Sequence, residues 1–198
     1  MPMEHERRGR APREMEAFSH TFLFADLVGF TALADREGDG RALDVALALQ
    51  RRVRGLLERH GAEQVKAIGD GVMLRFSDAR SAVRFGVRLL EELADEAGFP
   101  PVRVAIHTGA ALSSDGDWYG RTVNVAARLC SLAPPGGVIV SDRARDAAGQ
   151  IEGVSWSSGA LRWLRNVSAP VGTYLVRRPR NTLARPDPSR SAEAGSRG

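Results

Sequence analysis

The chain has 198 residues, enough for one well-buried domain with tails and too few for two comfortable domains. Its net charge is +4, but residues 18–176 hold 18 basic and 18 acidic side chains, which argues against the basic face of a nucleic-acid-binding protein. One cysteine, Cys130, excludes an internal disulfide, and no apolar run is long enough to cross a membrane. We therefore expect a cytoplasmic protein that binds neither nucleic acid nor membrane.

Two segments stand apart from the rest by composition. Residues 1–17 and the basic tail at 179–198 are rich in Arg, Pro, Ser, Glu and Gly and contain few large apolar side chains, so we predict that both are disordered. The segment between them, 18–178, is predicted to fold as a single domain.

Strand and helix signals alternate along this domain. The first elements are a strand at 21–25, a helix at 41–60 ended by Gly61, and strands at 63–68 and 72–76 joined at Gly69-Asp70-Gly71. A helix from Ser77 or Asp78 to 97 and a strand at 102–108 follow. The C-terminal part is predicted to contain a helix at 122–132, a strand at 138–140, a helix from 142, and strands near 155 and at 173–176. The first part reads βαββαβ. This order predicts an α+β fold with a ferredoxin-like, palm-type core, in which four antiparallel strands carry both helices on one face, extended by extra C-terminal helices and strands.

Two aspartates occupy positions that suggest a metal site. Asp26 directly follows the first strand, and Asp70 lies at the tip of the hairpin, which neighbours that strand in the predicted topology. Converging carboxylates suit Mg²⁺, which shares its remaining ligands with water and substrate phosphates. Taken singly, each has a plainer interpretation: Asp26 as the cap of the next helix and Asp70 as a turn residue.

Lys66 is the only lysine beside 27 arginines, and it lies four residues before Asp70. Its compact ammonium suits a single acceptor such as a base nitrogen or a phosphate oxygen, although arginine bias in the composition could leave one lysine by chance. Another pair, Asn124 and Arg128, is four residues apart and shares one helix face. An amide and a guanidinium there suit a sugar oxygen and a transferring phosphoryl group, or simply a helix surface in water.

Four blocks together, at 24–31, 66–71, 103–109 and 117–128, resemble the class III nucleotidyl cyclase catalytic domain in order and spacing. The resemblance covers about residues 18–178 and implies an adenylate cyclase, which makes 3′,5′-cyclic AMP and pyrophosphate from ATP with two Mg²⁺ or Mn²⁺ ions. It also implies a homodimer with both active sites at the interface.

The resemblance assigns roles to particular residues. Asp26, Asp70 and the Leu27 carbonyl would hold the metals, Lys66 and Asp117 would contact adenine, Asn124 would position the ribose, and Arg128 would stabilise the α-phosphoryl transition state. Independently of the resemblance, the segment Leu27-Val28-Gly29-Phe30-Thr31 passes into a helix, and the backbone N–H groups of such a start bind phosphate well, although it is also an ordinary helix N-terminus. Arg165 stands where the family usually has a triphosphate-binding lysine, and Asn166 replaces a glycine. His107 is interpreted as structural. The segment from Gly109 to Asp117 is short for the family's dimerisation arm.

Other functions remain open at this stage. A noncatalytic nucleotide-binding module would normally have lost a metal carboxylate or the Asn–Arg pair, and neither is lost here. A diguanylate cyclase would show a different sequence around Asp70. Since purine selection rests on only two side chains, a cyclase acting on GTP or on a pyrimidine triphosphate is the stronger alternative.

Overall fold

The computed structural model describes residues 19–177. The disorder predicted for 1–17 and 179–198 lies outside these residues. No helix within the described range is both long and apolar enough to cross a bilayer.

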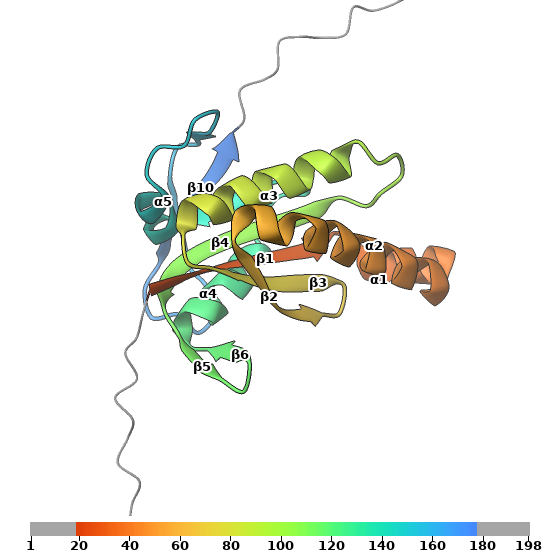
Figure 1. The fold of residues 1–198 in the computed structure, drawn as a ribbon, viewed down its shortest axis with the longest axis horizontal. Coiled ribbons are helices and arrows are strands. Elements are labelled where there is room, and N and C mark those ends of the chain that lie inside the picture. Colours follow the sequence, from red (N-terminus) through yellow and green to blue (C-terminus); the bar gives the residue numbers. More distant parts are fainter. Residues whose placement is uncertain (1–18, 178–198) are drawn as a thin grey trace, which may run out of the picture.

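A mixed eight-stranded sheet forms the centre of the molecule (Figure 1). The strands β2, β3, β1 and β4 lie side by side in that order, and each pair is antiparallel, as the predicted ferredoxin-like core requires. The sheet continues through β7, which is parallel to β4, and then β10, which pairs with β8 and β9. The strand bounds are β1 Ser19–Leu27, β2 Ala62–Ile68, β3 Gly71–Phe76, β4 Val102–Ala110, β7 Val138–Ser141, β8 Ser155–Trp156, β9 Ala160–Arg162 and β10 Val171–Arg177.

Within residues 19–177, five α-helices accompany the sheet, at α1 Phe30–Glu37, α2 Asp39–Leu57, α3 Ala79–Ala94, α4 Arg121–Cys130 and α5 Asp142–Ala148. Local signals set their ends. Asp78 caps α3 by accepting from the backbone N–H of Arg80 and Ser81 at 3.3 and 2.8 Å. Gly61, at φ +59°, ends the short 3₁₀ turn that follows α2, as its position predicted.

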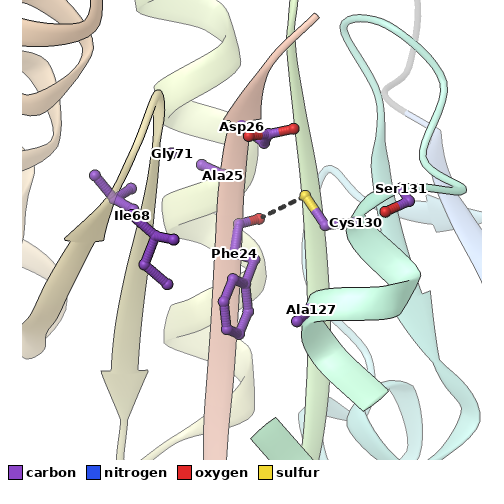
Figure 2. A pocket seen from close by; sticks show the side chains of 9 residues that line it. Phe24, Ala25, Asp26, Ile68, Gly71, Ala127, Cys130 and Ser131 are labelled. Carbon is purple, nitrogen blue, oxygen red and sulfur yellow. Dashed lines mark hydrogen bonds between the residues drawn. The ribbon is translucent and has the colours of Figure 1, made fainter. Parts of the chain in front are cut away.

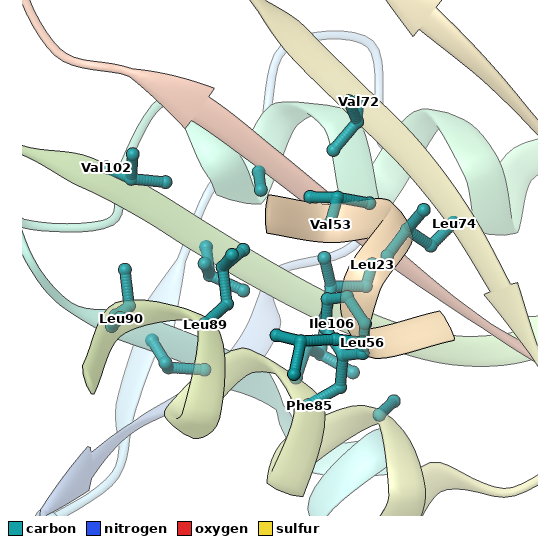
Figure 3. Close-up of a cluster of buried hydrophobic side chains, with 14 of the residues drawn as sticks. Leu23, Val53, Leu56, Val72, Leu74, Phe85, Leu89, Leu90, Val102 and Ile106 are labelled. Carbon is teal, nitrogen blue, oxygen red and sulfur yellow. The ribbon is translucent and has the colours of Figure 1, made fainter. Parts of the chain in front are cut away.

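The alternation of side chains along β1 separates two cores. Leu23, Ala25 and Leu27 point to the face covered by α2 and α3, where they join the large cluster drawn in Figure 3. Phe22 and Phe24 point to the other face, where α4 packs. The two helices of the predicted core therefore share one face, and α4 packs against the opposite face of the core strands.

Three features differ from the sequence expectations. First, β1 does not end at Ala25, because Asp26 and Leu27 continue its ladder with β4. Second, β9 carries no apolar pattern of its own and was not foreseen. Third, β5 Leu112–Ser114 and β6 Asp117–Tyr119 form a hairpin that projects from the main sheet (Figure 1). Its two turn residues, Asp115 and Gly116, both have positive φ, as a type I′ turn requires.

Candidate active site

Asp26 lies one residue before the end of β1, and strand alternation turns its side chain to the α4 face. In the ladder it stands between Gly71 of β3 and Arg103 of β4. Arg103 donates to Oδ2 of Asp26 from Nε at 2.9 Å and from Nη2 at 2.5 Å. This contact fixes the orientation of the carboxylate through one of its oxygens and leaves Oδ1 for another ligand.

The space beside Oδ1 depends on Gly71. A Cβ at this position would lie 3.0 Å from Oδ1 of Asp26 and 2.9 Å from the backbone oxygen of Ala25. Both distances are too short for an unstrained contact, so the missing side chain is what lets the hairpin approach Asp26 this closely. Figure 2 shows the two residues next to each other on adjacent strands.

Asp70 is the second residue of the two-residue turn between β2 and β3, after Gly69 at φ +58°. Burial raises the pKa of Asp70 above its ordinary value of 3.8, and the charge of Asp26 raises it further, while Arg103 acts in the opposite direction. The predicted convergence of Asp26 and Asp70 is consistent with this, because the Asp26 charge acts on Asp70. Two acidic groups that repel one another are a natural place for a cation.

The donor set fits Mg²⁺ or Mn²⁺. Within residues 19–177 no group of three or more His, Cys, Asp and Glu side chains could hold a metal ion, so the chain offers only a pair of carboxylates at this point. Mg²⁺ is usually bound through one or two carboxylates, with water and substrate phosphates completing its octahedron. Two acidic side chains and a neighbouring carbonyl are the kind of partial site that this ion accepts.

Lys66 and Asp117 come from β2 and β6, which are 51 positions apart, and form an ion pair. Lys66 donates from Nζ to Oδ2 of Asp117 at 2.5 Å, and the backbone N–H of Trp118 donates to Oδ1 at 2.8 Å. Both contacts, the lysine first, lower the pKa of Asp117. The structure therefore brings together the two side chains that the resemblance assigned to one base, and both remain partly exposed.

Asn124 and Arg128 lie on α4, one turn apart, with Asn124 exposed and Arg128 half-buried. Ala127, which directly precedes Arg128 on this helix, lines a cavity beside Asp26, as does Ser131 just after the helix. Arg128 forms no ion pair with any residue in the range 19–177. Its charge is therefore available to a ligand, as its predicted role requires.

The cavity itself lies between α4 and the ends of β1, β2 and β3 and has a volume of about 250 Å³ (Figure 2). Cys130 closes its inner side, with Sγ donating to the Phe24 carbonyl at 3.6 Å. Burial, followed by the charge of Asp26, raises the pKa of Cys130 to about 12. The thiol is thus protonated, packs as a small hydrophobic side chain on α4, and is not a nucleophile.

The remaining predicted residues flank this arrangement. At the start of α1, Gly29 has φ +76° and serves as the N-cap, but the N–H of Val28 already donates to the Pro101 carbonyl at 2.8 Å. That amide is therefore unavailable to phosphate. Arg165 is exposed in the loop before β10, and Asn166 has the left-handed φ of +56° that Asn tolerates. Buried Leu164 and Val167 anchor this loop in the same cluster as α4.

Arg103 is the residue in this region that sequence reasoning did not single out. It opens the third block of the resemblance, and only the pairing register of β1 and β4 places it opposite Asp26. The signal was indirect: a charged residue at the beginning of an otherwise apolar strand. The sequence pattern explained Gly71 as a turn residue. The structure gives a second reason for a glycine here, because a Cβ at this position would lie too close to Asp26.

A sequence model described as the adenylate and guanylate cyclase catalytic domain matches residues 14–155. The chain belongs to this family. Among similar cyclases, the pH-sensitive adenylate cyclase of Mycobacterium tuberculosis is 37% identical over 164 residues, which are 80% of this chain and 40% of that protein. An adenylate cyclase of Streptomyces coelicolor is 37% identical over 117 residues, which are 59% of this chain and 31% of that protein. The chain thus spans less than half the length of these relatives.

The cyclase fold is supported independently by solved structures. The adenylyl cyclase CyaB from P. aeruginosa superposes with a TM-score of 0.71, covering 84% of this chain and 97% of that one, at 22% identity. At this identity the likeness establishes the fold. The ferredoxin-like core with its added strands is therefore the cyclase arrangement.

Proposed function

We propose that this chain is the catalytic domain of an adenylate cyclase, which converts ATP into 3′,5′-cyclic AMP and pyrophosphate. The observation that carries the proposal is the Lys66–Asp117 pair, because it joins a donor and an acceptor in the pattern that adenine needs. Relatives named adenylate cyclase support the same substrate.

The base would be read by complementary hydrogen bonds. The ammonium of Lys66 can only donate, which suits adenine N1, and the ionised carboxylate of Asp117 can only accept, which suits the N6 amine. The lowered pKa of Asp117 keeps this group in the accepting form. Guanine would place N1–H against the donor and O6 against the acceptor, at a cost of about 1–3 kcal/mol for each unpaired buried group.

The reaction joins the ribose O3′ to the α-phosphorus and breaks the bond from that phosphorus to the bridging oxygen of pyrophosphate. Asn124 would hold the ribose in line, and Arg128 would stabilise the charge that develops on the α-phosphoryl oxygens. Arg165 and the start of α1 would bind the triphosphate. Two Mg²⁺ or Mn²⁺ ions at Asp26, Asp70 and the Leu27 carbonyl would supply charge neutralisation and a more acidic 3′-hydroxyl.

The active chain would be a homodimer. Each of its two sites would take Asp26 and Asp70 from one subunit and the base-reading pair, Asn124 and Arg128 from the other. One feature of the single chain supports this division: the guanidinium bound to Asp26 is that of Arg103, while Arg128 has no ion pair among the described residues.

The test is to incubate the purified chain with each of the four nucleoside triphosphates and Mg²⁺ or Mn²⁺, and to identify the products by mass spectrometry. We expect cyclic AMP from ATP, and a loss of more than about tenfold in Asp26→Ala, equivalent to about 1.4 kcal/mol in the barrier. Preferred cyclisation of another nucleotide would refute the substrate. Binding without any product would favour a noncatalytic module.

A further inference from the structure

A second polar cavity, separate from the one beside Asp26, has a volume of about 210 Å³. Its polar lining comes from His107 on β4, from the first two residues of α4, Arg121 and Thr122, and from the first two residues of α5, Asp142 and Arg143. None of the roles proposed above uses these side chains. The interpretation of His107 as purely structural does not account for the lining of this cavity.

His107 is 94% buried and has one ring nitrogen engaged. Nδ1 lies 2.7 Å from Oγ of Ser141, and that same oxygen accepts the N–H of Ala144 at 3.1 Å. The hydroxyl hydrogen of Ser141 then needs an acceptor, and Nδ1 is the atom in reach. We therefore assign the neutral tautomer with its hydrogen on Nε2; burial, followed by the charge of Arg143, lowers the pKa of His107 to about 4.

Nε2 of His107 has no hydrogen-bond partner among the described residues. At the same time, no fully buried side-chain nitrogen or oxygen in the described range lacks a partner. Both facts hold only if Nε2 is accessible to solvent, and His107 lines the polar cavity. The ring of His107, held in place by Ser141, therefore offers a fixed N–H donor that no described residue uses. This donor is available to water or to a ligand in the cavity.

The charges around this donor favour an anion. The guanidinium groups of Arg121 and Arg143 both act on His107, and neither has a hydrogen bond or ion pair with residues 19–177. One carboxylate, Asp142, opposes them, and its Oδ1 already accepts the N–H of Arg143 at 2.7 Å. The N-terminus of α4 adds backbone N–H groups and the positive end of the helix dipole.

We propose that this cavity binds a small oxyanion of phosphate size, free or as the phosphate group of an ester, through Nε2–H of His107 and the guanidinium groups of Arg121 and Arg143. Planar guanidinium groups can donate two hydrogen bonds to phosphate oxygens, and a fixed imidazole N–H would orient the bound anion. Since Asn124 and Arg128 lie on the same helix, an anion here would hold the first turn of α4 in place. This link to catalysis rests on the proposed function, whereas the binding itself does not.

The test is a titration of the full chain with inorganic phosphate, followed by the ¹⁵N resonances of the His107 ring. We expect a saturable shift at Nε2, and a loss of affinity of about tenfold or more in Arg121→Gln and in Arg143→Gln. The control is Arg51→Gln, at an exposed position of α2 on the opposite face of the sheet. It removes the same charge, and this variant should bind phosphate like wild type. Glycerol phosphate in a parallel titration distinguishes an ester from the free ion, and saturable binding of either supports the proposal.

The absence of a saturable shift with both anions would overturn the proposal. An equal loss in Arg51→Gln would do the same, because it would show attraction to overall charge and not to this cavity. Neither outcome bears on cyclisation of ATP, which is measured separately by its product.

Discussion

Among single residues, Asp70 carries an electrostatic cost when no cation is bound, because burial and the charge of Asp26 both raise its pKa. An acid whose pKa is higher in the folded chain than in the unfolded chain destabilises the fold once the pH exceeds both values. The cost vanishes below the ordinary value of 3.8, where the carboxyl group is protonated in both states. Partial exposure of Asp70 weakens the effect through solvent screening.

We therefore predict that Asp70→Asn raises the melting temperature of the metal-free chain at pH 7 by a few degrees and abolishes turnover. The amide keeps the shape of the side chain and removes the repulsive charge. Thermal unfolding in the presence of a chelator measures the gain, which should disappear below about pH 3.8. Asp44→Asn, on the exposed side of α2, is the control and should change neither quantity. A melting temperature at or below that of wild type would contradict the predicted cost.

The Lys66–Asp117 pair gives a second prediction for single residues. The double variant Lys66→Glu with Asp117→Cys should lower the use of ATP relative to GTP, because the new carboxylate accepts from guanine N1–H and the thiol can donate to O6. The ratio of kcat/KM for the two nucleotides measures the change. An unchanged ratio would show that this pair does not read the base.

Among the elements, the closeness of the β2–β3 hairpin to β1 depends on Gly71. Gly71→Ala would place a Cβ 2.9 Å from the backbone oxygen of Ala25 and 3.0 Å from Oδ1 of Asp26. We predict a loss of about 1–3 kcal/mol in unfolding free energy from the forced backbone shift, together with a loss of turnover because Asp26 moves.

The matched control is Gly40→Ala in α2, where a Cβ meets nothing within 4 Å and φ is not positive. This change should be neutral or stabilising by up to about 1 kcal/mol, since alanine favours the helix. Denaturant unfolding measures both variants. If Gly71→Ala retained the wild-type stability and turnover rate, the close approach of the β2–β3 hairpin to β1 would be required for neither.

The elements that sequence patterns predicted well are those with strong local signals. The apolar run of β1, the cap at Asp78 and the stop at Gly61 each act over a few residues, and the βαββαβ order followed from them. The β5–β6 hairpin was missed although Asp115-Gly116 is a strong type I′ signal, because its strands are only three residues long. Such short strands have too little alternation to be recognised.

The candidate site was predictable in a different way. Motifs singled out Asp26, Asp70, Lys66 and Asp117 and paired them by role, but they did not predict the hydrogen bonds that Asp26 and Lys66 form. The Asp26–Arg103 bond depends on the register of two strands 77 positions apart, and the Lys66–Asp117 bond depends on the hairpin that was missed. Register is a property of the assembled sheet, which no local pattern specifies.

At the scale of the whole molecule, the question is whether one chain holds a complete site. Asp26 lines one side of the cavity in Figure 2, together with Gly71, which follows Asp70 in the hairpin. The other side is lined by Ala127 and Cys130 of α4, the helix that also carries Asn124 and Arg128. In an isologous dimer each subunit presents both halves, so a two-fold axis would create two identical sites. The proposed division of the residues between subunits can therefore be tested with two variants, one changed in the carboxylate half of the site and the other in the α4 half.

We predict that mixing inactive Asp70→Ala with inactive Arg128→Ala restores activity. If the carboxylate and the arginine of a site come from different subunits, as proposed, each mixed dimer would contain one site with both defects and one site with neither. With equal and random exchange about half of the dimers are mixed, and one of their two sites works, so recovery should approach about a quarter of the wild-type rate. Subunit exchange is verified with two differently tagged chains. Exchange without recovery would place every catalytic residue of a site within a single chain.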